Sequence, residues 1–128
     1  MKNEELAARG VEAAKEFLAR RGYEIMTVDY VCDAGQIDII AYDPKCEAIV
    51  FTEVMTRKYK NATQGFPGER TNKTKRDRLE KVAADYLAQT EGLDDVQVRF
   101  DVISILVLDG SKAFLRHHIN AFGEMTAG

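Results

Sequence analysis

The sequence predicts an α/β fold, in which a mixed β-sheet is flanked by helices on its faces. Two stretches, residues 4–21 and 71–90, carry apolar side chains at the i, i+3, i+4 spacing of amphipathic helices. Short segments rich in Ile, Val, Phe and Thr fill the intervals between and after them, as expected of strands. The resulting order is helix, three strands, helix, two strands, which is typical of a layered α/β sandwich.

Each element has its own local signal. The first helix is expected from about Glu4 to Arg21, with Asn3 as its N-cap and Gly22 after its last turn. The second helix carries its apolar stripe on residues 79–87 and ends before Gly92. The strands are expected at residues 23–31, 36–42, 47–56, 96–108 and 113–119, the last two joined by an Asp109-Gly110 turn.

Length and composition indicate one globular domain covering residues 1–128. Hydrophobic residues make up 45% of the chain and charged residues 30%, as in an ordinary soluble protein. No apolar run approaches the ~20 residues that span a membrane, and the N-terminus lacks the apolar core of a signal peptide. Two cysteines without a CxxC spacing are expected to be reduced thiols. We therefore expect a cytoplasmic protein with no membrane contact.

The segment from Gly35 to Arg57 predicts a hairpin with two acids, Asp38 and Glu53, inside its apolar strands. If the turn is centred between residues 45 and 46, the two acids are directly opposite each other. A register shifted by two residues makes them diagonal neighbours, still roughly 7–8 Å apart. Adjacent carboxylates repel unless a cation lies between them or one stays protonated. The same spacing also fits two acids on the solvent-exposed face of a hairpin.

The residues around these acids carry a family resemblance. The strings GQIDIIA and VFTEVMTR, together with FLARRGYEI, RFDVISI and HHINAF, resemble the YraN-like family of predicted endonucleases over residues 6–122. That family is part of the PD-(D/E)xK restriction-endonuclease-like superfamily, which includes archaeal Holliday-junction resolvases. The resemblance implies an αβββαβ core and a Mg or Mn cofactor. It also implies a nucleic-acid partner, expected to be DNA, and a possible homodimer.

The resemblance also implies roles for individual residues. Asp38 corresponds to the first metal-binding acid, Glu53 to the acid of the ExK element, and the Val54 carbonyl to a further metal ligand. Where the family usually has Glu and Lys, this chain has Gln36 and Met55, which would face each other in the directly opposite register. A thioether is neither a cation nor a useful proton donor. The catalytic positions Asp38, Glu53, Gln36 and Met55 therefore describe a partly eroded site, with weak cleavage or none.

An acid on the first helix is a further candidate. In resolvase-like relatives such an acid can approach the metal, and Glu12 is the residue that corresponds best in this chain. A solvent-exposed position on the helix is the alternative.

Basic residues gather in one part of the chain although the net charge is −3. Residues 57–81 hold nine basic and three acidic side chains, a net charge of +6, so the rest of the chain carries −9. The start of the second helix adds backbone amides and a dipole that favour phosphate. The residues expected to contact nucleic acid are Arg57, Lys58, Lys73, Lys75, Arg76 and Arg78. A solvated helix face is the alternative.

Two functions remain open from the sequence. The first is a nucleic-acid-binding protein that resembles a metal-dependent endonuclease with an eroded site. In that case the polar loop at residues 58–71 would suit a flap over the substrate, although a linker fits equally well. The second is a non-enzymatic interaction or scaffold module built on the same fold.

Overall fold

A mixed β-sheet lies between two helices, as the sequence predicts. The computed structural model describes residues 3–60, 73–93, 95–108 and 112–121. The elements in chain order are α1 (Asn3–Arg20), β1 (Glu24–Cys32), β2 (Gly35–Asp43), β3 (Ala48–Lys58), α2 (Lys73–Ala88), β4 (Gln97–Val107) and β5 (Ala113–His118). The expected order is confirmed, and the element ends that can be compared agree within two residues. The expected loop at 58–71 falls mostly, and the Asp109-Gly110 turn wholly, outside the described residues.

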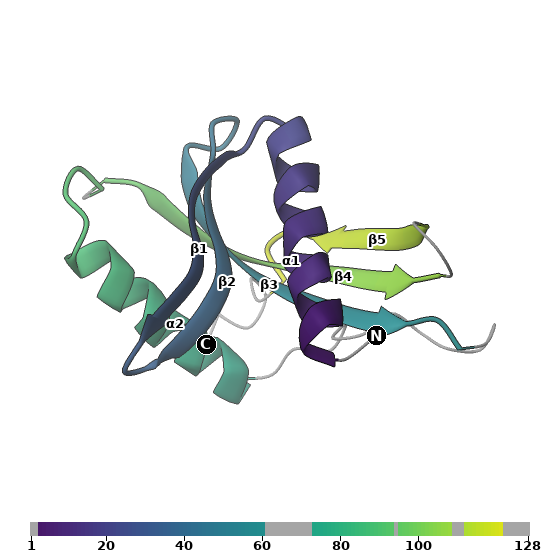
Figure 1. Ribbon diagram of the computed structural model, residues 1–128. Helices are drawn as coiled ribbons and strands as arrows, with labels where there is room; N and C mark the ends of the chain where they lie inside the picture. Colours follow the sequence, from purple (N-terminus) through teal and green to yellow (C-terminus); the bar gives the residue numbers. More distant parts are fainter. Residues whose placement is uncertain (1–2, 61–72, 94, 109–111, 122–128) are drawn as a thin grey trace.

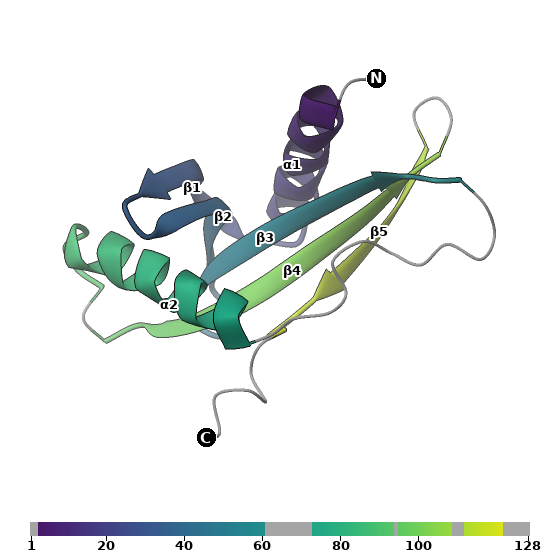
Figure 2. The same cartoon turned by 90° about the horizontal axis from the view of Figure 1, so that it is seen from below.

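The sheet has five strands in the order β1-β2-β3-β4-β5. Neighbouring strands are antiparallel except for β3 and β4, which run parallel. A parallel pair requires a crossover connection, and α2 lies in the segment that joins these two strands. Figures 1 and 2 show α1 on one face of the twisted sheet and α2 on the other. The predicted mixed sheet with helices on its faces is therefore confirmed.

The hydrophobic core is divided into two layers by the sheet. On the α2 side, Leu79, Val82 and Tyr86 pack against strand residues that include Phe51. On the α1 side, Ala14 and Leu18 pack against another set of strand residues. These helix positions recur at the spacing of one helix face, which explains why the amphipathic pattern predicted both helices. None of the described helices is both long and apolar enough to cross a bilayer.

Gly10 lets α1 approach the sheet closely. A Cβ atom at this position would lie 1.9 Å from Thr56 Oγ1 and 3.0 Å from Thr56 Cβ. Such distances are far inside van der Waals contact, so a side chain at position 10 would force the helix or the strand to move. Glycine at position 10 therefore sets the spacing between α1 and β3.

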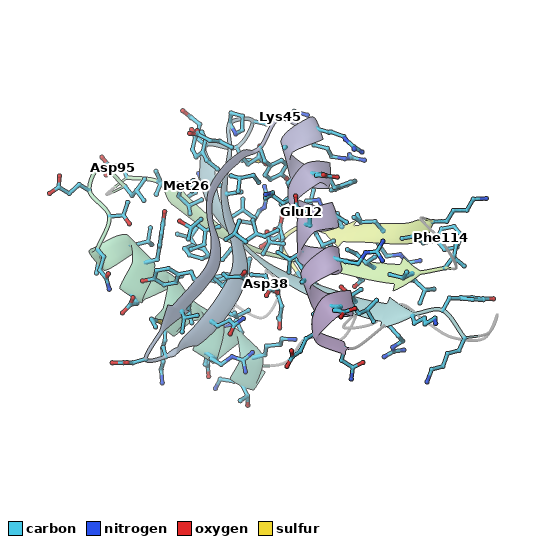
Figure 3. The ribbon with its side chains drawn as sticks, in the orientation of Figure 1. Glu12, Met26, Asp38, Lys45, Asp95 and Phe114 are labelled. Carbon is cyan, nitrogen blue, oxygen red and sulfur yellow. The ribbon has the colours of Figure 1, made fainter. Side chains whose placement is uncertain are left out.

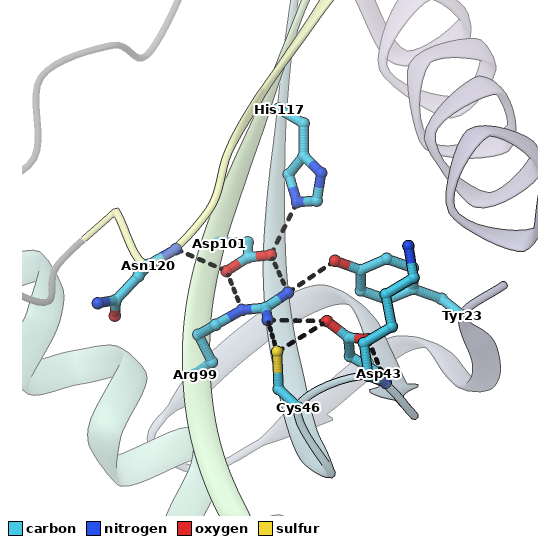
Figure 4. A network of polar contacts seen from close by, with 8 residues as sticks. Tyr23, Asp43, Cys46, Arg99, Asp101, His117 and Asn120 are labelled. Atoms are coloured by element: carbon cyan, nitrogen blue, oxygen red, sulfur yellow. Dashed lines mark hydrogen bonds and ion pairs between the residues drawn. The ribbon is translucent and has the colours of Figure 1, made fainter. Parts of the chain in front are cut away.

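A buried polar network links strands on the α1 face of the sheet (Figure 4). Arg99 donates two hydrogen bonds of 2.9 Å to Asp101, one of 2.9 Å to Asp43 and one of 2.7 Å to Tyr23. His117 Nε2 lies 2.7 Å from Asp101 Oδ2. Because Asp101 is fully buried, these partners compensate a charge that would otherwise be costly. The network joins β2, β4 and β5.

Candidate functional site

The β2–β3 hairpin brings Asp38 and Glu53 together. The ladder pairs Ile39 with Thr52, and the same register continued by one residue places Asp38 opposite Glu53. This is the directly opposite register, not the one shifted by two residues. Asp38 lies at the point where backbone pairing between the two strands stops. The two acids are therefore neighbours at the open end of the hairpin.

The Asp38 carboxylate replaces the missing backbone partner of β3. Its Oδ2 atom accepts a hydrogen bond of 2.7 Å from the Val54 N–H. The N–H and C=O of one strand residue point to the same side of the strand. The Val54 carbonyl is therefore expected to point toward the edge that Asp38 occupies, which is the orientation that a metal ligand at Val54 would need.

Burial is the largest influence on the pKa of Asp38, and neighbouring carboxylates add to it. Burial raises the pKa of Asp38, the Val54 N–H lowers it, and the Glu53 and Asp29 carboxylates raise it again, so that it ends above its ordinary value. The Lys75 ammonium acts in the lowering direction. A raised pKa means that the surroundings of the carboxylate do not fully stabilise its negative charge. A bound cation would supply that compensation.

Asp29 is a site residue that the sequence reasoning missed. It occupies the β1 position opposite Asp38, between the pairs Val28–Ile39 and Tyr30–Ile37. Its φ of 56° lies in the left-handed region, which aspartate tolerates better than most residues. The available signal was an acid inside the predicted strand at 23–31.

Lys75 on α2 pairs with Glu53. Its Nζ atom lies 3.0 Å from Glu53 Oε2, and both side chains are 17% exposed. Lys75 was expected to contact nucleic acid, and the structure places its ammonium beside the acids of the hairpin. The missed signal is its position four residues before Leu79, at the start of the buried helix stripe.

A pocket of about 540 Å³ opens beside the two acids. The residues lining it are Val31, Cys32, Gly35, Gln36, Asp38, Glu53, Val54 and Arg78. Arg78 reaches it from α2 across Gly35, where a Cβ atom would lie 3.4 Å from the arginine Cδ. The pocket therefore combines two carboxylates with a cationic side chain.

The two departures from the family pattern are placed apart. Gln36 is exposed and lines the pocket, whereas Met55 is half-buried and packs against the core layer on the α2 side. Backbone pairing between β2 and β3 ends at Ile39 and Thr52, so the expected pairing of Gln36 with Met55 is not formed. The strands separate at this point because the Asp38 side chain, not the β2 backbone, meets the Val54 N–H.

The remaining basic candidates lie on α2 and at the end of β3. Arg57 and Lys58 are exposed at the end of β3, and Lys73 and Arg78 are exposed on α2. Arg76 is half-buried and pairs with acids of its own helix, Glu80 at 2.9 Å and Asp77 at 4.0 Å. We therefore expect Arg76 to be less available to a ligand than the exposed members.

Glu12 is exposed on α1 and pairs within its own helix. Its side chain is 60% exposed on α1, where it pairs with Lys15 at 3.3 Å. Figure 3 labels Glu12 on α1, the helix that covers the face opposite α2. The solvent-exposed alternative holds for this residue.

The donor set at the site suits a hard cation. Within the described residues, no group of three or more His, Cys, Asp or Glu side chains is close enough to hold a metal ion. Magnesium, however, keeps several waters and often takes only one or two protein carboxylates. Asp38 and Glu53, with the Val54 carbonyl, meet that requirement.

Comparison with known proteins identifies relatives over most of the chain. Residues 10–105 match the profile of the Uncharacterised protein family UPF0102. A UPF0102 protein of Pelobacter propionicus is 37% identical over 120 residues, covering 94% of this chain and 84% of the relative. Another, from Dictyoglomus thermophilum, is 34% identical over 123 residues, covering 95% of this chain and 100% of the relative. A third, from Caldicellulosiruptor bescii, is 40% identical over 103 residues, covering 80% and 82%.

Proposed function

We propose a function on the premise that this chain belongs to the uncharacterised protein family UPF0102, the YraN-like family that its motifs indicate. The chain is a nucleic-acid-binding protein, with DNA as its preferred partner, built on a restriction-endonuclease-like fold. Its site at Asp38 and Glu53 binds Mg or Mn. The observation that carries this proposal is the adjacency of these acids beside a pocket that Arg78 also lines, with Lys75 paired to Glu53.

The pocket supports this function through its distribution of charge. Asp38 and Glu53 provide the oxygen atoms that a hard cation prefers, and Arg78 provides a planar donor suited to phosphate. The hydrogen bond from Val54 holds the Asp38 carboxylate in one orientation. A divalent cation, when bound, would lower the pKa of a coordinated water and stabilise charge on a phosphate.

The exposed basic residues on α2 and at the end of β3 are further candidates for phosphate contacts. Phosphate contacts of this kind position a nucleic acid without reading its sequence. Arg57 stays protonated and can act only as a charge clamp, and Lys58 adjoins it. The surface therefore favours recognition of backbone and shape over recognition of base sequence.

The site departs from the family pattern, and this limits the expected rate. Gln36 and Met55 replace an acid and a lysine, so cleavage is expected to be slow relative to relatives with both residues. Losing one placed donor near developing charge typically costs about 10²–10³ in rate, unless another side chain supplies the charge. Binding and cleavage must therefore be measured separately.

Metal binding gives the first test. Manganese titration by calorimetry should detect a site in the wild type that is lost in Asp38→Asn. Glu12→Gln is the matched control, because it removes an exposed acid on the other face of the sheet. Equal binding by wild type and Asp38→Asn would place the metal elsewhere.

Nucleic-acid binding and cleavage give the second test. Filter binding at two salt concentrations should show salt-dependent affinity for branched and linear DNA, and a metal-dependent assay should use branched, flapped and single-stranded substrates. Absence of both metal and DNA binding would reject this function and favour a non-enzymatic scaffold module.

A further inference from the structure

We propose that Lys75 supplies, from α2, the positive charge that a lysine at position 55 would supply from β3, and that its ammonium contacts the phosphate of a bound nucleic acid. This inference rests on the proposed function of the same site. It assigns to one residue the role that the sequence analysis left vacant at Met55.

The placement of Lys75 is the first support. Positions 75, 79, 82 and 83 lie on one face of the helix, and the last three of them are buried against the sheet. Lys75 thus continues the core stripe by one turn, which directs its side chain over the strands. The ammonium ends 3.0 Å from Glu53 Oε2, with only 17% of each side chain exposed. Lys73 and Lys81 on the same helix are exposed.

The neighbourhood of Met55 is the second support. Glu53 and Met55 are two residues apart on β3 and therefore share the α2 face of the sheet. Met55 is half-buried and packs against the core layer that α2 also contacts. A lysine at position 55 would bring a second ammonium to the face that Lys75 covers, and like charges disfavour one another. A neutral residue at 55 and a lysine at 75 are therefore complementary.

The chemistry of the ammonium allows both contacts. Lysine carries three N–H donors, so an ion pair with Glu53 is compatible with a phosphate contact. Glu53, the partner of Lys75, lines the pocket together with Arg78, and we place the phosphodiester there.

A different role must be separated from this one. The Lys75–Glu53 pair could act solely as a tether that holds α2 against β3. A lysine introduced at position 55 lies on the strand that carries Glu53, so it can restore the charge but cannot restore a tether to α2. Exchange of the two residues therefore distinguishes the roles.

The experiment compares Lys75→Met, the exchange variant Lys75→Met with Met55→Lys, and the control Lys45→Met. Lys45 is an exposed lysine in the β2–β3 turn, at the far end of the hairpin from Asp38 (Figure 3). Cleavage is measured with Mn²⁺, affinity for a branched DNA with Ca²⁺, and folding by circular dichroism. Lys75→Met should cleave about 10²–10³-fold more slowly and bind DNA more weakly. The exchange variant should regain most of the cleavage rate and most of the DNA affinity. The control Lys45→Met should match wild type in both.

Each outcome supports or rejects the proposed role of Lys75. The role of Lys75 is rejected if Lys75→Met cleaves and binds DNA as well as Lys45→Met does. It is also rejected if a folded exchange variant regains neither cleavage nor DNA affinity. If wild type binds DNA without cleaving it, the nuclease part of the proposed function fails and the affinities alone decide the role of Lys75. If the wild-type protein neither binds nor cleaves DNA, the proposed function and the role of Lys75 are both rejected. This outcome needs no variant, so it is distinct from a failure of the Lys75 proposal alone.

Discussion

Replacing Asp101 with alanine should destabilise the fold strongly, because Asp101 is the centre of the network on the α1 face. The carboxylate is fully buried and accepts hydrogen bonds of 2.9 Å from Arg99 Nε, Arg99 Nη2 and the Asn120 N–H. It also lies 2.7 Å from His117 Nε2. The change to alanine removes every one of these contacts at once.

The expected loss in the free energy of unfolding follows from the partners that Arg99 would keep and lose. Arg99 is only 12% exposed and would keep Asp43 and Tyr23 as partners, but it would lose its bidentate carboxylate. Breaking a buried ion pair by removing one partner typically costs about 3–5 kcal/mol. For a domain of this size, about 1 kcal/mol corresponds to ~4 °C in Tm. We therefore expect a loss of roughly 12–20 °C.

Urea unfolding followed by circular dichroism at pH 7 measures this cost. The control is Glu16→Ala, which removes an exposed pair with Arg20 at 3.9 Å and should change the free energy of unfolding by less than about 0.5 kcal/mol. A cost for Asp101→Ala below about 1 kcal/mol would refute the view that this network holds β4 and β5 in place.

Three further predictions concern stability, acid sensitivity and DNA binding. Gly10→Ala should lower the Tm, because overpacking against Thr56 costs about 1–3 kcal/mol, against at most ~1 kcal/mol gained in helix propensity; an unchanged Tm would contradict the close approach. Burial alone would raise the pKa of Asp101, but its hydrogen bonds lower it on balance, so its contribution is present above the unfolded pKa of about 3.9 and is lost as the pH falls through the lower folded value. Acid titration of Asp101→Asn should accordingly show a shallower loss of stability than wild type. Lys73→Ala should reduce the log–log salt slope of duplex binding by about 0.9, and an equal slope would remove Lys73 from the interface.

The fold could be predicted closely because its signals are local. The amphipathic stripe of each helix and the alternation of the strands depend on residues near one another in the chain. The sequence left two hairpin registers open, both of which make Asp38 and Glu53 neighbours, and the structure has the directly opposite one. Arg99 and Asp101 are two residues apart on β4 and therefore share one face, which allows the pair seen in the structure.

The rest of the site depends on contacts between distant segments. The pairing of Lys75 with Glu53 requires the position of α2 over the sheet, which no local pattern specifies. The end of β2–β3 pairing depends on a side chain that binds a backbone N–H, so simple extrapolation of the ladder wrongly paired Gln36 with Met55. Tertiary packing, not strand propensity, decides these details.

The position of α2 in the chain sets the order in which the site can be completed. The hairpin from Gly35 to Lys58 is local and can pair as soon as it leaves the ribosome, whereas Lys75 arrives later on a helix between two parallel strands. Pairing of β3 with β4 closes a long loop and is intrinsically slower than hairpin formation. A nascent chain that ends before residue 73 therefore carries both acids without the cation from α2. The site acquires its full set of charges only when synthesis has passed the crossover, which couples its assembly to completion of the whole sheet.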